Sequence, residues 1–288
     1  MRVAHVITIV VGMIFVSSAA GQDDAENLSK DQDSLARLQF MRDSVQKMVV
    51  KPIKTGDERD LTIKAQPLLR YNDSARNVAD SAVWRVGTTG RPTAIVTSEV
   101  YGPSNDSYRL SHEYLAVDNP QLTIKCGGFV WTPPPATTLT FLKFESEERP
   151  AENPKLRLTQ IKRLAKKFTT GEQLGSSKIE LRVLPTPIDR YEPSDKPHSD
   201  GAIFAAVWGV NPEALLFIET DGETWTYAWA RMGAAMVWAS LDDKEVWNAP
   251  PIASLADLGK PTAPYANSGG AILVPASLFD KRNADKKP

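Results

Sequence analysis

The chain has 288 residues, of which 42% are hydrophobic and 24% charged, and its formal net charge is −1. This composition is typical of a globular protein, and the near balance of charge gives no reason to expect binding to nucleic acid or to an anionic membrane. The single cysteine, Cys126, excludes a disulfide within the chain, so the fold depends on burial and hydrogen bonding.

Residues 1–20 have the pattern of a secretory signal peptide. Met1 and Arg2 form a short basic start, segment 3–16 is almost wholly apolar, and residues 17–20 are small, as a cleavage site requires. The alternative is a retained membrane anchor, but an apolar core of about 14 residues is shorter than the roughly 20 that a spanning helix needs. We therefore expect an exported protein, periplasmic or extracellular, without an integral membrane span after cleavage.

The acidic segment 21–34 is expected to be a flexible lead, and an amphipathic helix is expected to follow it. An apolar stripe with spacings of three and four residues carries this prediction: Leu38, Met41, Val45 and Met48. The stripe recurs 120 positions later as Leu158, Ile161, Ala165 and Phe168. Basic residues such as Arg37 and Arg157 are expected on the outer, solvated face of each helix.

The main organising pattern is a repeat between segments 67–99 and 187–219. Nine of the 33 aligned positions are identical at a constant shift of 120, whereas unrelated sequences of ordinary composition should give roughly two. The identical residues of the first copy are Pro67, Arg70, Tyr71, Ser74, Asp80, Ala82, Pro92, Ala94 and Glu99. Chance is a poor explanation for this agreement.

After each helix the periodicity changes to that of β-strands, and Asp221-Gly222 predicts a tight hairpin turn between two of them. We therefore predict an α+β fold with an internal duplication, in which each unit is one amphipathic helix packed on an antiparallel sheet of about five or six strands. The predicted units are residues 35–150 and 151–258. Residues 259–288 are expected to form a loop-like C-terminal tail, with an apolar stretch that docks on the body.

Five phrases occur in a fixed order along the mature chain: Pro-Leu-Leu-Arg-Tyr (67–71), Thr-Gly-Arg-Pro (89–92), His-Glu-Tyr (112–114), Arg-Tyr (190–191) and Tyr-Ala-Trp-Ala-Arg-Met (227–232). Together they resemble an uncharacterised family of bacterial exported proteins of unknown function. The resemblance implies export from a bacterial cell. It carries no known activity and therefore transfers no catalytic residue.

Residues suited to catalysis are few. The mature chain has two histidines, His112 and His198, and no nucleophile elbow, phosphate loop or zinc motif, so neither a metal nor a cofactor is predicted. His112 and Glu113 are the first candidates for acid–base work. Because adjacent strand residues point to opposite faces, these two side chains are not expected to share a pocket unless the strand bulges.

Glu99 and Glu219 are the other catalytic candidates, because they are matched across the repeat. They would form a pair of carboxylates at hydrolase spacing if the two sheets met about a pseudo-twofold axis. The structural alternative is that they form salt bridges with Arg70 and Arg190, which are themselves candidate ligand-binding residues.

Trp225, Tyr227 and Trp229 alternate with other residues and should lie on one strand face. Exposed, Trp225 and Trp229 would be ligand-binding candidates together with Arg231, because aromatic rows stack on sugars and peptides. We predict instead that the rings face the second helix and that Arg231 lies at the rim of the sheet.

The sequence thus favours an exported, non-enzymatic binding or envelope-associated protein, whose partner would be an envelope polymer or another exported protein. The alternative is a carboxylate-dependent hydrolase acting on envelope or extracellular polymers. A concave pocket that holds an acid of shifted pKa would favour the enzyme, and a flat aromatic patch would favour the binding protein. The ligand and the oligomeric state are not encoded in any motif that we recognise.

Overall fold

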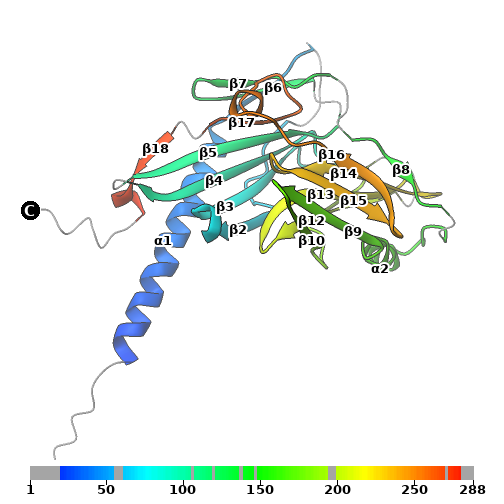
Figure 1. The fold of residues 1–288 in the computed structure, drawn as a ribbon, viewed down its shortest axis with the longest axis horizontal. Coiled ribbons are helices and arrows are strands. Elements are labelled where there is room, and N and C mark those ends of the chain that lie inside the picture. The colour runs from blue at the N-terminus through cyan, green and yellow to red at the C-terminus, as the bar shows by residue number, and fades with distance from the viewer. Residues whose placement is uncertain are drawn as a thin grey trace, which may run out of the picture.

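The computed structural model describes residues 20–54, 61–104, 107–118, 121–135, 139–145, 148–193, 199–269 and 272–279. The expected signal peptide lies outside the described residues, apart from Ala20. Within the described ranges, eighteen strands form three antiparallel sheets, accompanied by three α-helices (Figure 1).

The first sheet has the strand order β17-β5-β4-β3-β2, and β18 pairs with the same strand, β5, that β17 does. Its elements are β2 (Leu69–Asp73), β3 (Val78–Val86), β4 (Ala94–Ser104), β5 (Ser107–Ala116), β17 (Tyr265–Asn267) and β18 (Ile272–Pro275), with the 3-10 turn η1 (Ser74–Arg76) between β2 and β3. A small sheet, β1-β6-β7, is built from β1 (Val49–Pro52), β6 (Leu122–Cys126) and β7 (Phe129–Trp131).

The second sheet has the order β16-β15-β9-β10-β12-β13-β14-β8, and β11 also pairs with β12. Its strands are β8 (Leu142–Lys143), β9 (Phe168–Leu174), β10 (Ser177–Val183), β11 (Asp189–Tyr191), β12 (Asp200–Trp208), β13 (Asn211–Thr220), β14 (Trp225–Arg231), β15 (Met236–Leu241) and β16 (Lys244–Ala249). The predicted hairpin at Asp221-Gly222 is confirmed, because Thr220 pairs with Trp225 across it.

The helices are α1 (Ala20–Gln46), α2 (Pro154–Ala165) and the single turn α3 (Leu255–Leu258), and a 3-10 turn, η2 (Ala276–Leu278), follows β18. α1 includes the segment 21–34 that we expected to be a flexible lead, and its N-terminal part extends away from the sheets (Figure 1). Its C-terminal half packs Met41 and Val45 on the first sheet, and α2 packs Ile161 and Leu164 on the second.

The two large sheets pack face to face around a shared core. Tyr71, Val83 and Ile95 of the first sheet lie in one apolar cluster with Leu215 and Phe217 of the second. Each sheet therefore has one face against its helix and the other face against the other sheet, which explains why most central strand residues are buried on both faces.

The predicted α+β fold, with one helix on each five- or six-stranded sheet, is wrong. The described residues are mostly β-structure, in large curled sheets. Strands beyond the expected set enlarge the second sheet, and the expected loop-like tail supplies β17 and β18 to the first. The physical reason is that a second sheet, rather than a helix, covers the inner face of each sheet.

Strand pairing follows the same register in both large sheets at the shift of 120. Ala82 pairs with Ser98 in the first sheet, as Ala202 pairs with Ile218 in the second. α1 lies on β3 and β4, and α2 lies on the corresponding strands β12 and β13. The two halves of the chain nonetheless exchange strands. β8 from the first half pairs with β14 of the second sheet, and β17 and β18 from the C-terminal end pair with β5 of the first sheet.

If packing between the sheets carries the fold, Leu215→Ala should lower the free energy of unfolding by about 2–5 kcal/mol, because Leu215 is fully buried in the shared core. Leu255→Ala is the matched control, since Leu255 is 85% exposed and should change stability by at most about 0.5 kcal/mol. Urea unfolding of the two variants measures both values. Equal small losses would contradict the shared core.

Candidate functional site

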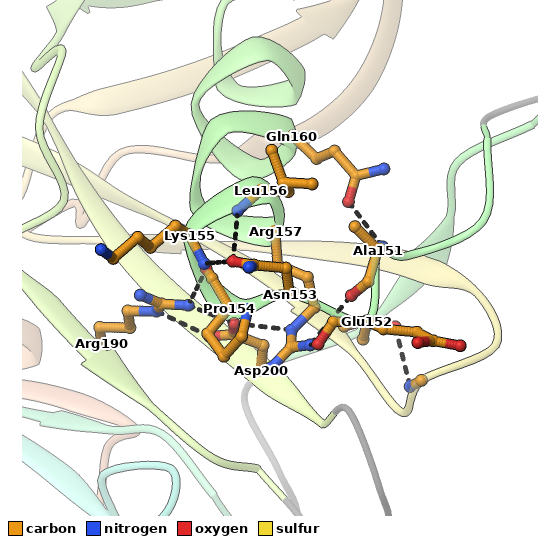
Figure 2. Close-up of polar contacts among 12 residues, drawn as sticks. Ala151, Glu152, Asn153, Pro154, Lys155, Leu156, Arg157, Gln160, Arg190 and Asp200 are labelled. Atoms are coloured by element: carbon orange, nitrogen blue, oxygen red, sulfur yellow. Dashed lines mark hydrogen bonds and ion pairs between the residues drawn. The ribbon is translucent and has the colours of Figure 1, made fainter.

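A clamp of two arginines and one aspartate fastens the start of α2 to the second sheet (Figure 2). Asp200 accepts hydrogen bonds from Nε of Arg157 and from Nε of Arg190, both at 2.9 Å. Arg190 Nη2 also donates to the carbonyl of Pro154 at 2.6 Å, and the side chain of Asn153 caps the helix by accepting from the amide of Lys155 at 2.8 Å. The side chains of Arg157, Arg190, Asp200 and Asn153 are therefore all engaged within the fold.

The same clamp occurs in the first half, 120 positions earlier. Asp80 accepts from Nε of Arg70 at 2.9 Å and from Nε of Arg37 at 3.4 Å, and Arg70 donates to the carbonyl of Ser34 at 2.6 Å. Arg70 and Arg190 thus pair with Asp80 and Asp200 rather than with the expected glutamates.

The placement of Arg157 corrects a further expectation. Its side chain lies on the buried face of α2 and not on the outer basic face, with only 6% of the residue exposed. The aspartate in the sheet explains this, because an arginine this buried needs a charged partner.

Three arginines of the first half reach across to acids of the second half. Arg91 donates to both oxygens of Glu219, Nε at 2.7 Å and Nη2 at 2.6 Å. The two remaining pairs join Arg85 to Asp189 and Arg76 to Glu213. These pairs link the two sheets at the ends of the shared apolar core.

The matched glutamates lie in different surroundings. Tyr71 donates to Glu99 at 3.1 Å and Tyr191 donates to Glu219 at 2.7 Å, so the tyrosine contact is common to both. Glu219 has a guanidinium partner, whereas the second donor to Glu99 is the phenol of Tyr101, at 2.6 Å. The charge of Glu99 acts on Glu213 and contributes to its raised pKa. Glu213 lies six residues from Glu219 along β13, which is a distance of about 20 Å in an extended strand. Glu99 and Glu219 therefore do not form a catalytic pair.

A carboxylate cluster surrounds Glu99 at one end of the core; we define it as Asp73, Glu99, Glu113, Glu172 and Glu213. Arg76 is its common cation and pairs with Asp73 at 3.2 Å, with Glu172 at 3.4 Å and with Glu213. One oxygen of Glu172 is buried without a hydrogen-bond partner. Asp73, Glu172 and Glu213 thus share one guanidinium, whose side chain is itself 30% exposed.

Burial raises the pKa of every glutamate in the cluster. The pKa of Glu213 rises to about 7, because burial and the charge of Glu172 outweigh the attraction of Arg76. The pKa of Glu113 is raised well above its usual value by burial and then by Glu99, and the pKa values of Glu99 and Glu172 are also raised, chiefly by burial. Burial thus favours the neutral form of these glutamates, which limits the repulsion between them.

Two cavities open beside the cluster and share Tyr101 and Arg109. One, of about 570 Å³, is lined by Arg76, Asn77, Gly102, Ser107 and Leu273 in addition to this pair. The other, of about 290 Å³, adds Ser111, Asn267 and the α3 residues Leu255 and Leu258. The guanidinium of Arg109 lies 4.4 Å from the centre of the Tyr101 ring. We call Arg76, Tyr101 and Arg109 the mouth, because Tyr101 connects both cavities to Glu99.

His112 is placed on the opposite face of β5 from Glu113, as the strand alternation predicted. It is 1% exposed and lies within hydrogen-bond distance of Ser98 Oγ at 2.8 Å and Ser44 Oγ, on α1, at 3.0 Å. Burial lowers its pKa to about 4, so the ring is neutral and holds α1 to the sheet. His198 lies outside the described residues.

The aromatic row faces inward, and the prediction that it packs under α2 is confirmed. Trp225 and Trp229 are each 2% exposed and lie in one cluster with Ile161 and Ala165 of α2. Arg231 donates to the carbonyls of Gly233, Pro250 and Ala235, so its head caps the backbone at the strand end. Neither tryptophan is available as a ligand surface.

Glu99 and Glu113 were candidates from the sequence alone, whereas Arg76, Glu172 and Glu213 were not. Glu172 and Glu213 each lie within a largely buried strand segment, and an acid inside such a run was the available signal. Arg76 had no signal, because only the turn η1 directs it across to the second sheet.

Comparison with family models, with curated proteins and with solved structures gives no match. In the part of the chain that the structure describes, no helix is both long enough and apolar enough to cross a membrane. Across the same residues, no three His, Cys, Asp or Glu side chains are arranged to hold a metal ion.

Arg157→Ala should lower the free energy of unfolding by about 3–5 kcal/mol, because Asp200 loses one partner of a buried ion pair. The control on the same helix is Arg163→Ala, whose partner Glu148 is 59% exposed and whose loss should cost at most about 1 kcal/mol. Urea unfolding measures both. A loss in Arg157→Ala no larger than in the control would refute the clamp.

Replacing Glu213 with Gln should flatten the dependence of stability on pH. The folded pKa of about 7 exceeds the ordinary value of 4.5, so the folded state binds the proton more tightly, and this contribution to stability is lost as the pH rises from 4.5 to 7. One such group gives at most about 1.4 kcal/mol per pH unit. Unfolding free energies of Glu213→Gln and wild type at pH 5, 6 and 7 test this, with the exposed Glu223→Gln as control. A difference that stays constant with pH would contradict the raised pKa.

Proposed function

We propose that the protein is an exported, non-enzymatic binding protein associated with the cell envelope, and that the mouth is its ligand site. The observation that carries the proposal is the convergence of two cavities on one exposed arginine stacked against Tyr101. The aromatic row of the second sheet is buried and offers no competing surface.

An anionic saccharide segment of an envelope polymer fits the chemistry of the mouth best. Arg109 makes no ion pair with the described residues, so its guanidinium is available to a carboxylate. Ser107 supplies a hydroxyl group for sugar hydroxyls, and Leu255 and Leu258 supply apolar contacts. Ser111 and Asn267 also line the smaller cavity, where Ser111 donates to Asn267 and Asn267 donates to Glu113. Arg76 adds positive charge at the same opening, although it already pairs with Asp73, Glu172 and Glu213.

The proposal also includes export of the protein and an internal repeat in its sequence. The pattern of residues 1–20 supports a cleaved signal peptide and a periplasmic or extracellular location. The matched strand register and the two matched clamps support a repeat that relates segments 67–99 and 187–219. A site at only one end of the interface is then explained by divergence between the two copies.

Hydrolysis of envelope polymers is the second candidate, because Glu213, with a pKa of about 7, lies beside a second carboxylate. Such a group can act as a general acid near neutral pH. Against this, Glu213 is 4% exposed and pairs with Arg76, so a substrate would have to displace that contact.

Arg109→Ala should reduce binding to an anionic envelope polymer, because the exposed cation of the mouth is removed. The measurement is the fraction of protein that pellets with purified peptidoglycan sacculi, which carry free carboxylates, and we expect a loss of about fivefold to tenfold, the worth of one charge-assisted contact. Arg149→Ala, another exposed arginine, is the matched control. Equal pelleting of both variants would reject the mouth as the site, and release of soluble fragments that Glu213→Gln abolishes would favour the hydrolase.

A further inference from the structure

A separate groove lies on the opposite side of the second sheet, beside the C-terminal end of α2. It has a volume of about 570 Å³ and is formed by α2, β9, β10 and β12. The mouth shares no residue with it, so an inference drawn from the groove does not depend on the proposed function.

The groove exists because β10 changes its partner along its length. Ser177 to Leu181 pair with β9, whereas only Arg182 and Val183 pair with β12. β10 thus runs beside β12 for only two residues, and α2, β9 and β10 lie close together in Figure 1. The groove lies between α2 and these strands.

The floor and walls of this groove are apolar. Phe168, Leu181 and Phe204 form the floor and are buried, and Leu184 and Pro185 line the wall. Phe168, Leu181 and Phe204 belong to the core cluster that also holds the aromatic row, so the groove is floored by the core of the second sheet. A cavity of this size and lining is within the range of small-molecule sites, which is about 300–1,000 Å³.

The rim is basic. Lys162 lies on the last turn of α2, Lys166 is the C-cap of the same helix, and Arg182 lies on β10. Glu180 is the one acid lining the groove among the described residues. Neither lysine pairs with an acid in the part of the chain that the structure describes, and Arg182 makes one long hydrogen bond, 3.3 Å, to the carbonyl of Gly209. The rim therefore carries an excess of two positive charges above an apolar floor.

We propose that this groove binds a fatty acid, with the alkyl chain on the apolar floor and the carboxylate between Lys162, Lys166 and Arg182. Charge complementarity selects the anion, because a cationic or neutral amphiphile with the same chain would leave the three cations unpaired. The apolar floor favours a ligand with an alkyl chain, because each methylene group removed from water strengthens binding.

The test is isothermal titration of the full mature protein with dodecanoate below its micellar concentration. We expect saturable binding at one site, at least tenfold weaker binding of dodecyltrimethylammonium, and about fourfold weaker binding for each methylene removed from the chain. The variant Lys162→Gln/Lys166→Gln should weaken dodecanoate binding at least tenfold. The control Lys155→Gln/Lys178→Gln removes two other lysines, from α2 and β10, and should bind as wild type.

Three outcomes would overturn the proposal. They are the absence of dodecanoate binding at 1 mM, equal binding of the cationic amphiphile, and unchanged binding by the Lys162→Gln/Lys166→Gln variant with a wild-type melting temperature. A concentration-dependent dimer that the same variant dissociates would assign the groove to a second copy of the chain instead.

Discussion

Contact between the two large sheets is the interaction on which the rest of the molecule depends. Its centre is a layer of aliphatic and aromatic side chains. At its ends, arginines of the first half bind acids of the second, such as Arg91 with Glu219 and Arg85 with Asp189. Any shift of one sheet over the other would leave these buried charges unpaired, at a cost of several kcal/mol for each ion. The apolar layer thus supplies stability, and the ion pairs fix the relative position of the sheets.

The candidate site follows from an asymmetry in that contact. Position 91 carries an arginine that neutralises Glu219, and the residue 120 positions later is Asn211, whose amide donates to Asp73 at 3.1 Å. Glu99, the counterpart of Glu219, therefore lacks an arginine of its own and shares Arg76 with its neighbours. At one end of the interface Glu219 has its own arginine, whereas at the other end buried glutamates of raised pKa gather beside two cavities.

The halves are also joined by exchanged segments. β8 pairs with β14 of the second sheet, and β17 and β18 pair with β5 of the first. Trp131 Nε1 donates to the carbonyl of Ala263 at 2.9 Å, which fixes the C-terminal segment near the small sheet. Because each sheet is completed by a segment from the other end of the chain, neither half has all the strands of its own sheet.

The sequence alone determined what local periodicity and composition can encode. It predicted the second helix, the hairpin at Asp221-Gly222, the alternation that separates His112 from Glu113, and the burial of Trp225 and Trp229, because each rests on spacings of two to four residues. The register shared by segments 67–99 and 187–219 was also in the sequence, as identities at a constant shift.

Only the tertiary structure decided which element covers the inner face of each sheet. A strand buried under a helix and one buried under a second sheet have the same apolar pattern, so the α+β prediction was the wrong choice between two equal readings of that pattern. The carboxylate cluster was hidden for a similar reason, since Arg76 and Glu213 lie 137 positions apart and meet only because the sheets pack face to face. A contact between charged residues far apart in the chain produces no periodic pattern in the sequence. The carboxylate cluster could therefore be recognised only from the tertiary structure.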